Sequence, residues 1–366
     1  MAEEYFIGLM SGTSLDGVDA SLVAFPSAGA RILSALSTPF EPELQSRLRA
    51  LATDHRLSPD LLAESERALT DRYADAVSTL LQNSPVPREQ ITAVGCHGQT
   101  IRHLPAQSFS WQIGNPALLA ATTALPVIAD FRSGDLARGG QGAPLAPAFH
   151  QAFFADRQER RMVVNIGGIA NVSCLAPGEP VRGWDTGPGN TLLDAWYRRH
   201  HKRGRWDESG QWAASGAVHE DLLSRLLNDP YFQAPAPKST GPEHFNLEWL
   251  ESHAGLRLDR LADADVQATL LELTVRPIAT AAATMAADRV IVAGGGAFNT
   301  RLRHCLTERL GGIPLVASDE FGIPADQVES AGFAWLARER WHGRSVPLQA
   351  VTGAGSDGLS GAVWQP

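Results

Sequence analysis

The chain is predicted to fold as a mixed α/β protein with two lobes, and three observations carry this prediction. Strand-like and helical patterns of apolar residues alternate along the sequence, which is typical of the α/β class. Two hairpins of similar plan, at 6–23 and 162–175, each open one such segment. The length of 366 residues and the hydrophobic content of 44% suffice for about two domains with their own cores. We place the boundary near residue 130, with an N-terminal lobe at 1–130, to which the C-terminal tail can return, and a C-terminal lobe at 131–366.

The individual elements follow from apolar periodicity and from capping and turn residues. Further strands are expected at 31–36, 91–95, 126–130 and 290–293. Helices are expected at 41–52, 59–81, 117–123, 191–200 and 262–287. Residues 131–144 contain four glycines between ordered elements, so we expect a loop there that crosses between the lobes and bends.

Charge and cysteine usage exclude several classes of protein. A net charge of −9 and a pI near 5.7 argue against nucleic acid or an anionic membrane as the main partner. The basic cluster at 198–205 is expected to be the cationic last turn of a helix and the loop after it. Three widely spaced cysteines match neither a disulfide framework nor a zinc site, and the N-terminus has no signal-peptide pattern. Because the apolar stretch 117–129 is also too short to span a membrane, we expect a soluble cytoplasmic protein.

The turns of the two hairpins consist mostly of small residues, at 11–16 in the first and at 167–168 in the second. A turn without bulky side chains lets backbone N–H groups approach phosphate oxygens. Most glycine-containing hairpins only reverse the chain, but the recurrence of this plan in both segments favours phosphate binding. The sequence has no Walker A loop, and its GxGxxG match at 353–358 lies too near the C-terminus to open a dinucleotide-binding unit.

Asp185 is the candidate general base. It lies in a turn just ahead of a predicted helix whose N-cap would be Asn190. A nearby helix N-terminus keeps a carboxylate ionised and ready to accept a proton, although it limits the basicity of that carboxylate. The alternative, in which Asp185 only caps or hydrogen-bonds the turn, is equally open at this point.

Polar side chains follow the expected strand at 91–95, where α/β proteins usually place ligand groups. His97, Gln99 and Thr100 suit sugar hydroxyls, but they can equally satisfy the backbone of their own strand end.

Charged residues near two turns are further candidates. Arg132, Asp135 and Arg138 can bind a carboxylate or a phosphate, or can pair with one another. Asp16 and Asp19 lie close enough to the first turn to orient a metal ion or a hydroxyl, although aspartate is common in turns.

An ordered set of motifs resembles one family over essentially the whole chain. These motifs lie at 8–17, 95–100, 112–116, 129–132, 139–145, 165–171 and 185–190. Each is weak alone, but together and in this order they resemble the 1,6-anhydro-N-acetylmuramic acid kinase family. One departure is Pro242 in the segment 238–243, where an arginine is expected, so the contribution of that loop to substrate contacts is left open.

The resemblance implies a two-lobed fold of the acetate and sugar kinase, actin and heat-shock chaperone superfamily, with a ribonuclease-H-like core in each lobe and a central cleft. It implies an enzyme that opens the 1,6-anhydro bridge of the sugar with water and phosphorylates O6 with ATP. The products would be N-acetylmuramic acid 6-phosphate and ADP, in peptidoglycan recycling and amino-sugar catabolism. The ligands would be this small-molecule sugar and ATP, with Mg²⁺ on the phosphates and no nucleic-acid or membrane partner, and a homodimer is left open.

By the same resemblance, Asp185 is the catalytic base. The residues that would bind ATP and its phosphates are Ser11, Gly12, Thr13, Ser14, Leu15, Asp16, Gly17, Val18, Gly167, Gly168, Asn171 and, at the adenosine, Gly294, Gly295 and Gly296. The residues that would bind the sugar are His97, Gln99, Thr100, Arg132 and Glu329. Glu329 also reads as part of an ordinary helix start, and no residue is assigned to a metal.

Two other functions share part of this pattern. Another sugar or acid kinase of the superfamily would have both hairpins but would phosphorylate an existing hydroxyl. An ATP-driven clamp without catalysis would have both lobes, but it would not need 97–100 and 185–190 to face a small-molecule cavity.

Overall fold

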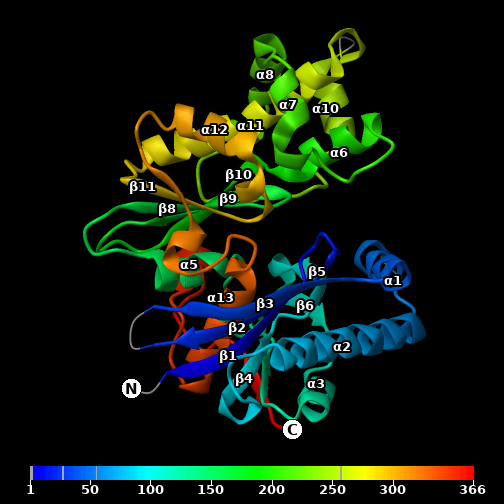
Figure 1. Cartoon of the computed structure of the whole chain (residues 1–366), viewed down its shortest axis with the longest axis vertical. Helices are drawn as coiled ribbons and strands as arrows, with labels where there is room; N and C mark the ends of the chain where they lie inside the picture. The colour runs from blue at the N-terminus through cyan, green and yellow to red at the C-terminus, as the bar shows by residue number, and fades with distance from the viewer. Residues whose placement is uncertain (1–2, 27–28, 55, 256–257) are drawn as a thin grey trace. The chain divides into compact units, whose positions relative to one another are not determined.

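Two units make up the chain in a computed structural model that describes residues 3–26, 29–54, 56–255 and 258–366 (Figure 1). Unit 1 comprises Met1–Phe153 and Phe321–Pro366, and unit 2 comprises Phe154–Glu320. The C-terminal segment therefore belongs to unit 1, which is the return that the sequence allowed. Residues 131–153 also belong to unit 1, so the observed division differs from the predicted boundary at residue 130.

A six-stranded sheet in the order β13-β7-β4-β1-β2-β3 forms the centre of unit 1. The strands are β1 (Glu4–Met10), β2 (Gly17–Phe25), β3 (Arg31–Pro39), β4 (Ile91–Cys96), β7 (Val127–Ala129) and β13 (Ala362–Trp364). β1, β2 and β3 pair antiparallel, β4 runs parallel to β1, and β7 runs parallel to β4. Phe6, Ile7 and Leu9 of β1 are fully buried, as expected for a strand of a sheet that helices cover on both faces.

The helices of unit 1 are α1 (Pro42–Thr53), α2 (Pro59–Gln82), α3 (Pro116–Thr123), α4 (Ser133–Ala137), α5 (Ala146–Phe154), α13 (Val328–Trp341) and α14 (Gln349–Thr352). Three of them, α2, α3 and α13, pack against this sheet, and the others surround them (Figure 1). A small hairpin of β5 (Gln99–Leu104) and β6 (Phe109–Ile113) follows β4. α13 packs so closely on β1 and β4 that a Cβ at Gly8 would lie 1.8 Å from the Ser330 carbonyl oxygen, and one at Gly95 would lie 2.2 Å from that of Phe333. Glycine is therefore required on both strands for the helix to reach the sheet.

The glycine-rich segment 131–144 folds within unit 1, so the prediction that it crosses between the lobes is wrong. The Asp135 carboxylate, which is buried, accepts hydrogen bonds from Gly142 N at 2.7 Å and from Thr352 Oγ1 at 2.7 Å. These bonds tie the segment to the C-terminal part of the same unit. The chain passes between the units at Phe153/Phe154 and at Glu320/Phe321 instead.

Unit 2 repeats the strand plan of unit 1 in a five-stranded sheet of order β10-β9-β8-β11-β12. The strands are β8 (Arg161–Ile166), β9 (Ile169–Leu175), β10 (Arg182–Pro188), β11 (Arg289–Ala293) and β12 (Leu315–Ala317). β8, β9 and β10 pair antiparallel, and β11 and β12 continue the sheet parallel to β8. The order matches β3-β2-β1-β4-β7, which confirms the repeated plan inferred from the two hairpins.

Helices gather on the sheet of unit 2 around the long helix α11 (Figure 1). They are α6 (Asn190–His200), α7 (Gln211–Ser215), α8 (Glu220–Leu227), α9 (Pro230–Gln233), α10 (Leu247–Ala254), α11 (Asp263–Thr284) and α12 (Thr300–Arg309). All of the predicted helices and strands are present, with ends that differ by up to three residues.

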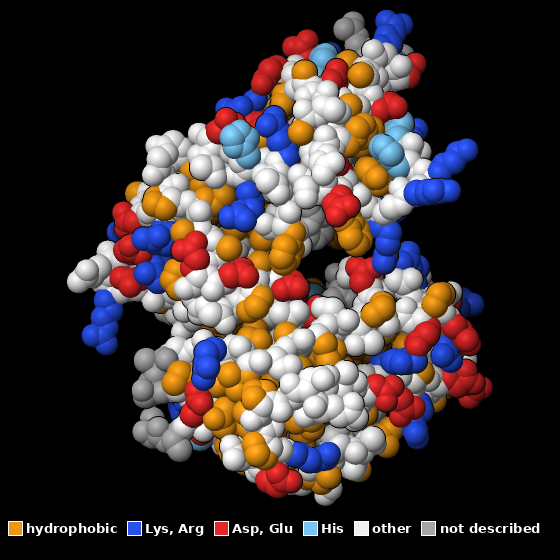
Figure 2. Space-filling view, in the orientation of Figure 1, with side chains coloured by type: hydrophobic (Ala, Val, Ile, Leu, Met, Phe, Trp, Pro, Cys, Tyr) orange, Lys and Arg blue, Asp and Glu red, His pale blue; other side chains and the backbone are white. Residues whose placement is uncertain are grey.

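Charges of both signs lie side by side on part of the surface. Figure 2 shows basic and acidic side chains next to one another over α1 and α2, where Arg67 pairs with Asp71 and Arg72 with Glu41. The basic cluster at 198–205 begins in the last turn of α6, as predicted. The three cysteines are buried free thiols. Among the described residues, every helix is too short or too polar to cross a membrane.

Candidate active site

The first hairpin turn, 11–16, is held by residues that follow β4. Ser11 Oγ lies 2.6 Å from the Tyr73 hydroxyl and donates to Gly98 O at 3.2 Å, while Gln99 Nε2 donates to Gly12 O at 3.1 Å. Gln99 is completely buried, and its Oε1 has no hydrogen-bond partner among the described residues. An unpartnered buried acceptor of this kind fits a ligand donor.

His97 and Arg132 form a pair next to this turn. Arg132 Nε and Nη2 lie 3.2 and 2.9 Å from His97 Nε2, and Arg132 Nη1 donates to Gly142 O at 2.8 Å. Burial, and then the Arg132 charge, lower the pKa of His97 to about 3, so its ring is neutral and accepts from the guanidinium. Burial also lowers the pKa of Arg132 to about 10, which leaves it charged at neutral pH.

Glu329 lies in the first turn of α13, within electrostatic range of Arg132 and Asp19. Desolvation by the surrounding protein and the Asp19 carboxylate raise the pKa of Glu329, and Arg132 opposes this rise. Thr100 is also tied locally, because its Oγ1 accepts a hydrogen bond from Gln112 Nε2 at 3.0 Å. Unit 1 thus brings the predicted sugar residues into one neighbourhood.

The remaining predicted residues of the first hairpin differ in what they offer. Thr13, Ser14 and Asp16 are exposed on the turn. The side chains of Leu15 and Val18 are buried in the core of unit 1, so only their backbone groups can reach a ligand. Gly17 packs on β3, where a Cβ would lie 2.2 Å from Thr38 O.

The second hairpin turn contacts the start of α6. Gly168 O accepts hydrogen bonds from Gly189 N at 2.8 Å and from Thr191 N at 3.0 Å, and Gly167 O accepts from Asn190 N at 2.8 Å. Asn190 was predicted as the N-cap of α6, but the cap is Gly189, without a side-chain bond. The turn carbonyls take the first amides of the helix, and a capping side chain has no part to play.

Asp185 lies on β10 opposite Asn171 of β9, with its own contacts to a later loop. Its Oδ2 accepts a hydrogen bond from Thr240 N at 2.9 Å, and its backbone carbonyl accepts one from the Tyr231 hydroxyl at 2.7 Å. Burial raises the pKa of Asp185 to about 6, although the Thr240 N–H lowers it. Since α6 is capped by Gly189, the alternative in which Asp185 caps this helix is wrong.

A cavity of about 470 Å³ in unit 2 lies beside the glycines that follow β11. Its lining residues are Asn190, Leu193, Asp194, Trp206, Asp207, Glu208, Ser209, Gln267, Gly295, Phe298 and Asn299. Gln267 is 1% exposed, and its Oε1 has no hydrogen-bond partner among the described residues. Trp206 and Phe298 offer exposed aromatic faces. Residues 206–209 and Gln267 were not predicted from the sequence as part of this cavity. The run of glycines after a predicted strand was the one signal that pointed to it.

The three glycines have different parts in this cavity. A Cβ at Gly294 would lie 2.4 Å from Asn165 Oδ1, and one at Gly296 would lie 2.4 Å from Ile166 Cγ2, so both are needed for packing. Gly295 lines the cavity, and a Cβ there would come no closer than 3.8 Å, to Asn190 Nδ2.

Comparison with known sequences decides the family. The sequence profile of anhydro-N-acetylmuramic acid kinase matches residues 4–366. The chain belongs to this family. It is 44% identical to the anhydro-N-acetylmuramic acid kinase of Pasteurella multocida over 368 residues, covering 99% of this chain and 97% of that one. The enzymes of that name from Coxiella burnetii and Thiobacillus denitrificans are 43% and 44% identical, with 100% and 98% of this chain covered and 98% and 97% of theirs.

Solved structures give only distant similarity. A ROK family glucokinase from Streptomyces griseus, in complex with glucose and AMPPNP, aligns with a TM-score of 0.43 at 15% identity, covering 92% of this chain and 99% of that one. Membership of the anhydro-N-acetylmuramic acid kinase family makes the chain an enzyme that transfers a phosphoryl group, so the non-enzymatic clamp is not favoured.

Proposed function

We propose that the protein converts 1,6-anhydro-N-acetylmuramic acid, water and ATP to N-acetylmuramic acid 6-phosphate and ADP. Water attacks C1, the C1–O6 bond breaks, and O6 forms a bond to the γ-phosphorus as the bond to ADP breaks. One proton of the water goes to a base and then to solvent, so that charge and atoms balance. The reaction would serve peptidoglycan recycling and amino-sugar catabolism.

The observation that carries this proposal is the state of Asp185. Its carboxylate is largely desolvated and has a pKa of about 6, near neutrality, with a backbone N–H as the donor that holds it. A general base works best when its pKa lies near the operating pH. We assign to Asp185 the removal of a proton from the water that attacks C1.

Sugar binding is assigned to the residues around the first hairpin. Arg132 is charged and held in place by His97 and Gly142 O, so it can orient an acidic sugar. Gln99 Oε1 can accept from a sugar hydroxyl, and Glu329 can orient the sugar or the water.

Nucleotide binding is assigned to the two turns and to the cavity beside Gly295. The cavity volume of about 470 Å³ and its mixed aromatic and polar lining suit a nucleoside. Gly12 and Gly167 have no side chain at these turns, and a Cβ there would come no closer than 3.7 and 3.6 Å to other atoms, which suits close approach of phosphate oxygens.

Mg²⁺ is part of the same proposal, as an ion brought by the nucleotide. Among the described residues there is no group of three or more histidines, cysteines or acids that could hold a metal alone. Nucleotide-bound Mg²⁺ is usually held mainly by phosphate and water. Asp16 and Asp19 would supply carboxylate oxygens. Burial raises the pKa of Asp19, and the neighbouring Asp326 and Asp16 carboxylates add to this rise. When bound, the ion would neutralise charge on the phosphates.

The compartment and the oligomeric state complete the proposal. We assign the protein to the cytoplasm, where ATP is available, and include a homodimer as its form in solution. Light scattering coupled to size-exclusion chromatography would test the dimer.

The reaction is tested by mass spectrometry of the product formed in isotopically labelled water. One label on the sugar and a phosphate on O6, both dependent on ATP and the anhydro sugar, are expected. As a control, unlabelled N-acetylmuramic acid 6-phosphate is incubated in the labelled water without the enzyme. This measures spontaneous exchange of oxygen at C1. Equal turnover of plain N-acetylmuramic acid would indicate an ordinary sugar kinase instead.

A further inference from the structure

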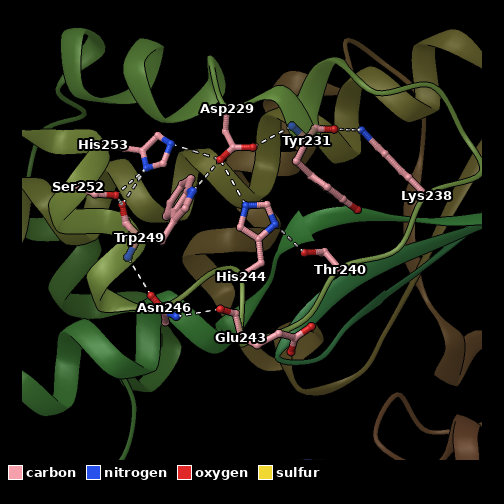
Figure 3. Close-up of polar contacts among 10 residues, drawn as sticks. All are labelled: Asp229, Tyr231, Lys238, Thr240, Glu243, His244, Asn246, Trp249, Ser252 and His253. Atoms are coloured by element: carbon pink, nitrogen blue, oxygen red, sulfur yellow. Dashed lines mark hydrogen bonds and ion pairs between the residues drawn. The ribbon is translucent and has the colours of Figure 1, made fainter. Parts of the chain in front are cut away.

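A polar network in unit 2 extends from a buried carboxylate, Asp229, through two histidines (Figure 3). Asp229 Oδ1 accepts from Tyr231 N at 2.8 Å, and Oδ2 accepts from Trp249 Nε1 at 2.7 Å. His244 Nε2 and His253 Nε2 each lie 3.3 Å from the same Oδ2. Burial raises the pKa of Asp229, but the bonds from Trp249, Tyr231 and His244 lower it below its ordinary value overall.

The two histidines lead in different directions from Asp229. His244 Nδ1 lies 3.3 Å from Thr240 Oγ1, and Thr240 N donates to Asp185 Oδ2 at 2.9 Å. His253 Nδ1 instead contacts Ser252 Oγ and Trp249 O, within its own helix α10. Of these two histidines, His244 is the one whose contacts lead to the Asp185 carboxylate within the described part of the chain. Tyr231 also links Asp229 to Asp185, but it bonds the backbone carbonyl of Asp185 and not its carboxylate.

Aromatic packing holds the His244 ring in its orientation. The ring stacks on Phe245 at a centroid distance of 4.3 Å and 12° between planes, and its edges meet Tyr231 and Trp249. A ring fixed in this way orients the Thr240 hydroxyl, and hence the loop whose amide binds Asp185.

We propose that Asp229 and His244 are positioning residues, which hold Thr240 so that its N–H stays on the Asp185 carboxylate. This inference rests on the proposed role of Asp185 as the base. It also gives the loop at 238–243 a role that does not depend on substrate contact. Pro242 fits this role, because the turn is closed by bonds from His244 N and Phe245 N to Gly241 O and needs no N–H at position 242.

The charged and titratable groups near Asp185 in unit 2 decide how a change in this network would alter the pKa of Asp185. Among the described residues they include Tyr231 on α9, whose hydroxyl bonds the Asp185 carbonyl, and Lys238 on the loop, whose carbonyl accepts from Asp185 N. Lys238 Nζ is turned to the Tyr231 carbonyl and ring, away from a pairing with Asp185. The Thr240 N–H is therefore the contact that favours the ionised form of Asp185, and its loss would raise the pKa of that carboxyl.

The test compares pairs of variants that differ only in the link to Asp185. His244→Phe keeps an aromatic ring, and His253→Phe removes the other histidine from the same Asp229 oxygen. Thr240→Val removes the hydroxyl while keeping the shape of the side chain, and Thr240→Ser keeps the hydroxyl. We expect His244→Phe and Thr240→Val to lower kcat by about tenfold and to move the acid limb of the pH profile to higher pH. We expect His253→Phe and Thr240→Ser to leave the limb in place, and KM for ATP to stay constant throughout.

NMR titration of the Asp185 carboxyl carbon in the unliganded protein makes the test independent of turnover. The signal is assigned as the one that disappears in Asp185→Asn. A higher pKa in His244→Phe and Thr240→Val than in their controls supports the positioning role. Identical titration in each pair overturns it, even where kcat falls. If the wild-type protein fails to turn over the anhydro sugar, or Asp185→Asn stays fully active, the proposed function fails while the NMR titration still decides the link. Thr240→Val carries the test if His244→Phe does not fold.

Discussion

The two hairpins share their strand plan but differ in what holds their turns. In unit 1, six residues connect β1 to β2, and side chains that follow β4, above all Gln99, bind the turn. In unit 2, two glycines connect β8 to β9, and their carbonyls accept the first amides of α6. A repeated sheet can thus carry one turn supported by side chains and one supported by backbone. The turn at 11–16 should therefore respond to substitution of the side chains that bind it. The turn at 167–168 should respond to substitutions that alter its own backbone.

The units also differ in the charge state of their buried ionisable groups. Unit 1 holds a neutral His97 against a charged Arg132, which suits binding of an anion. Unit 2 holds Asp185 with a pKa of about 6, which suits removal of a proton. The comparison therefore predicts that substitution of Asp185 in unit 2 affects kcat and that substitution of Arg132 in unit 1 affects KM for the sugar.

The largest effect is expected from Asp185→Asn, which keeps the shape of the side chain but removes the base. Turnover should fall by roughly 10²- to 10⁴-fold while the sugar still binds. Single-turnover kinetics and sugar titration would measure the two separately. Asp259→Asn, an exposed aspartate of the same unit, is the control and should be fully active. Unchanged turnover in Asp185→Asn would mean that Asp185 only organises its loop.

The next effect concerns the glycines of the two turns. A Cβ at Gly12 would come no closer than 3.7 Å to other atoms, and one at Gly167 no closer than 3.6 Å, and neither residue adopts a left-handed backbone. Gly12→Ala and Gly167→Ala should therefore fold normally but weaken ATP binding by at least about tenfold, because the added methyl group occupies the phosphate approach.

Gly8→Ala is the matched opposite of these two variants. Its Cβ would lie 1.8 Å from the Ser330 carbonyl oxygen, so it should lower the melting temperature by several degrees. Melting curves and nucleotide titrations on all three variants separate packing from binding. Intact ATP affinity in both turn variants would reduce the hairpins to chain reversals.

A smaller effect is expected from Arg132→Lys in unit 1. Lysine cannot reach both His97 Nε2 and Gly142 O with the fixed geometry of a guanidinium. KM for the sugar should rise by about tenfold, with less change in kcat. Arg138→Lys is the control, because Arg138 lies six residues later and binds Ser356 O instead. A loss confined to kcat would contradict the division of roles between the units.

The sequence predicted the strands and helices well, because local apolar periodicity determines them. The family resemblance implied that residues 97–100 and the first turn serve one site, which stays a prediction. The parallel pairing of β1 and β4, which these two segments follow, was not predicted. It could not predict that Thr240 binds Asp185, because 55 positions separate the two and nothing local records the contact. Gln267 was missed for the same reason, as its helical neighbours read as ordinary core.

Two errors have a common physical cause. The glycines at 134–142 were interpreted as backbone freedom, but Asp135 binds Gly142 N and Thr352 and removes that freedom. Asn190 was interpreted as a helix cap, but the carbonyls of Gly167 and Gly168 already bind the helix amides. In both places a distant hydrogen-bond partner outweighed a local propensity.

The last prediction concerns stability in acid, where the buried histidines of unit 1 and Asp185 of unit 2 should respond with opposite signs. Burial lowers the pKa of His97 and of His150 to about 3, both in unit 1, so the unfolded chain binds these protons first. Stability from each histidine is thus full above pH 6.5 and is lost as pH falls toward 3. Asp185 in unit 2 responds oppositely, because a pKa raised to about 6 lets the folded state bind its proton first.

Between pH 7 and pH 5, each histidine should therefore lower the free energy of unfolding by about 2 kcal/mol. Urea unfolding of the wild type and of His150→Leu at the two pH values measures the difference: the variant should lose less stability on acidification, whereas equal losses would mean that His150 takes up its proton without unfolding.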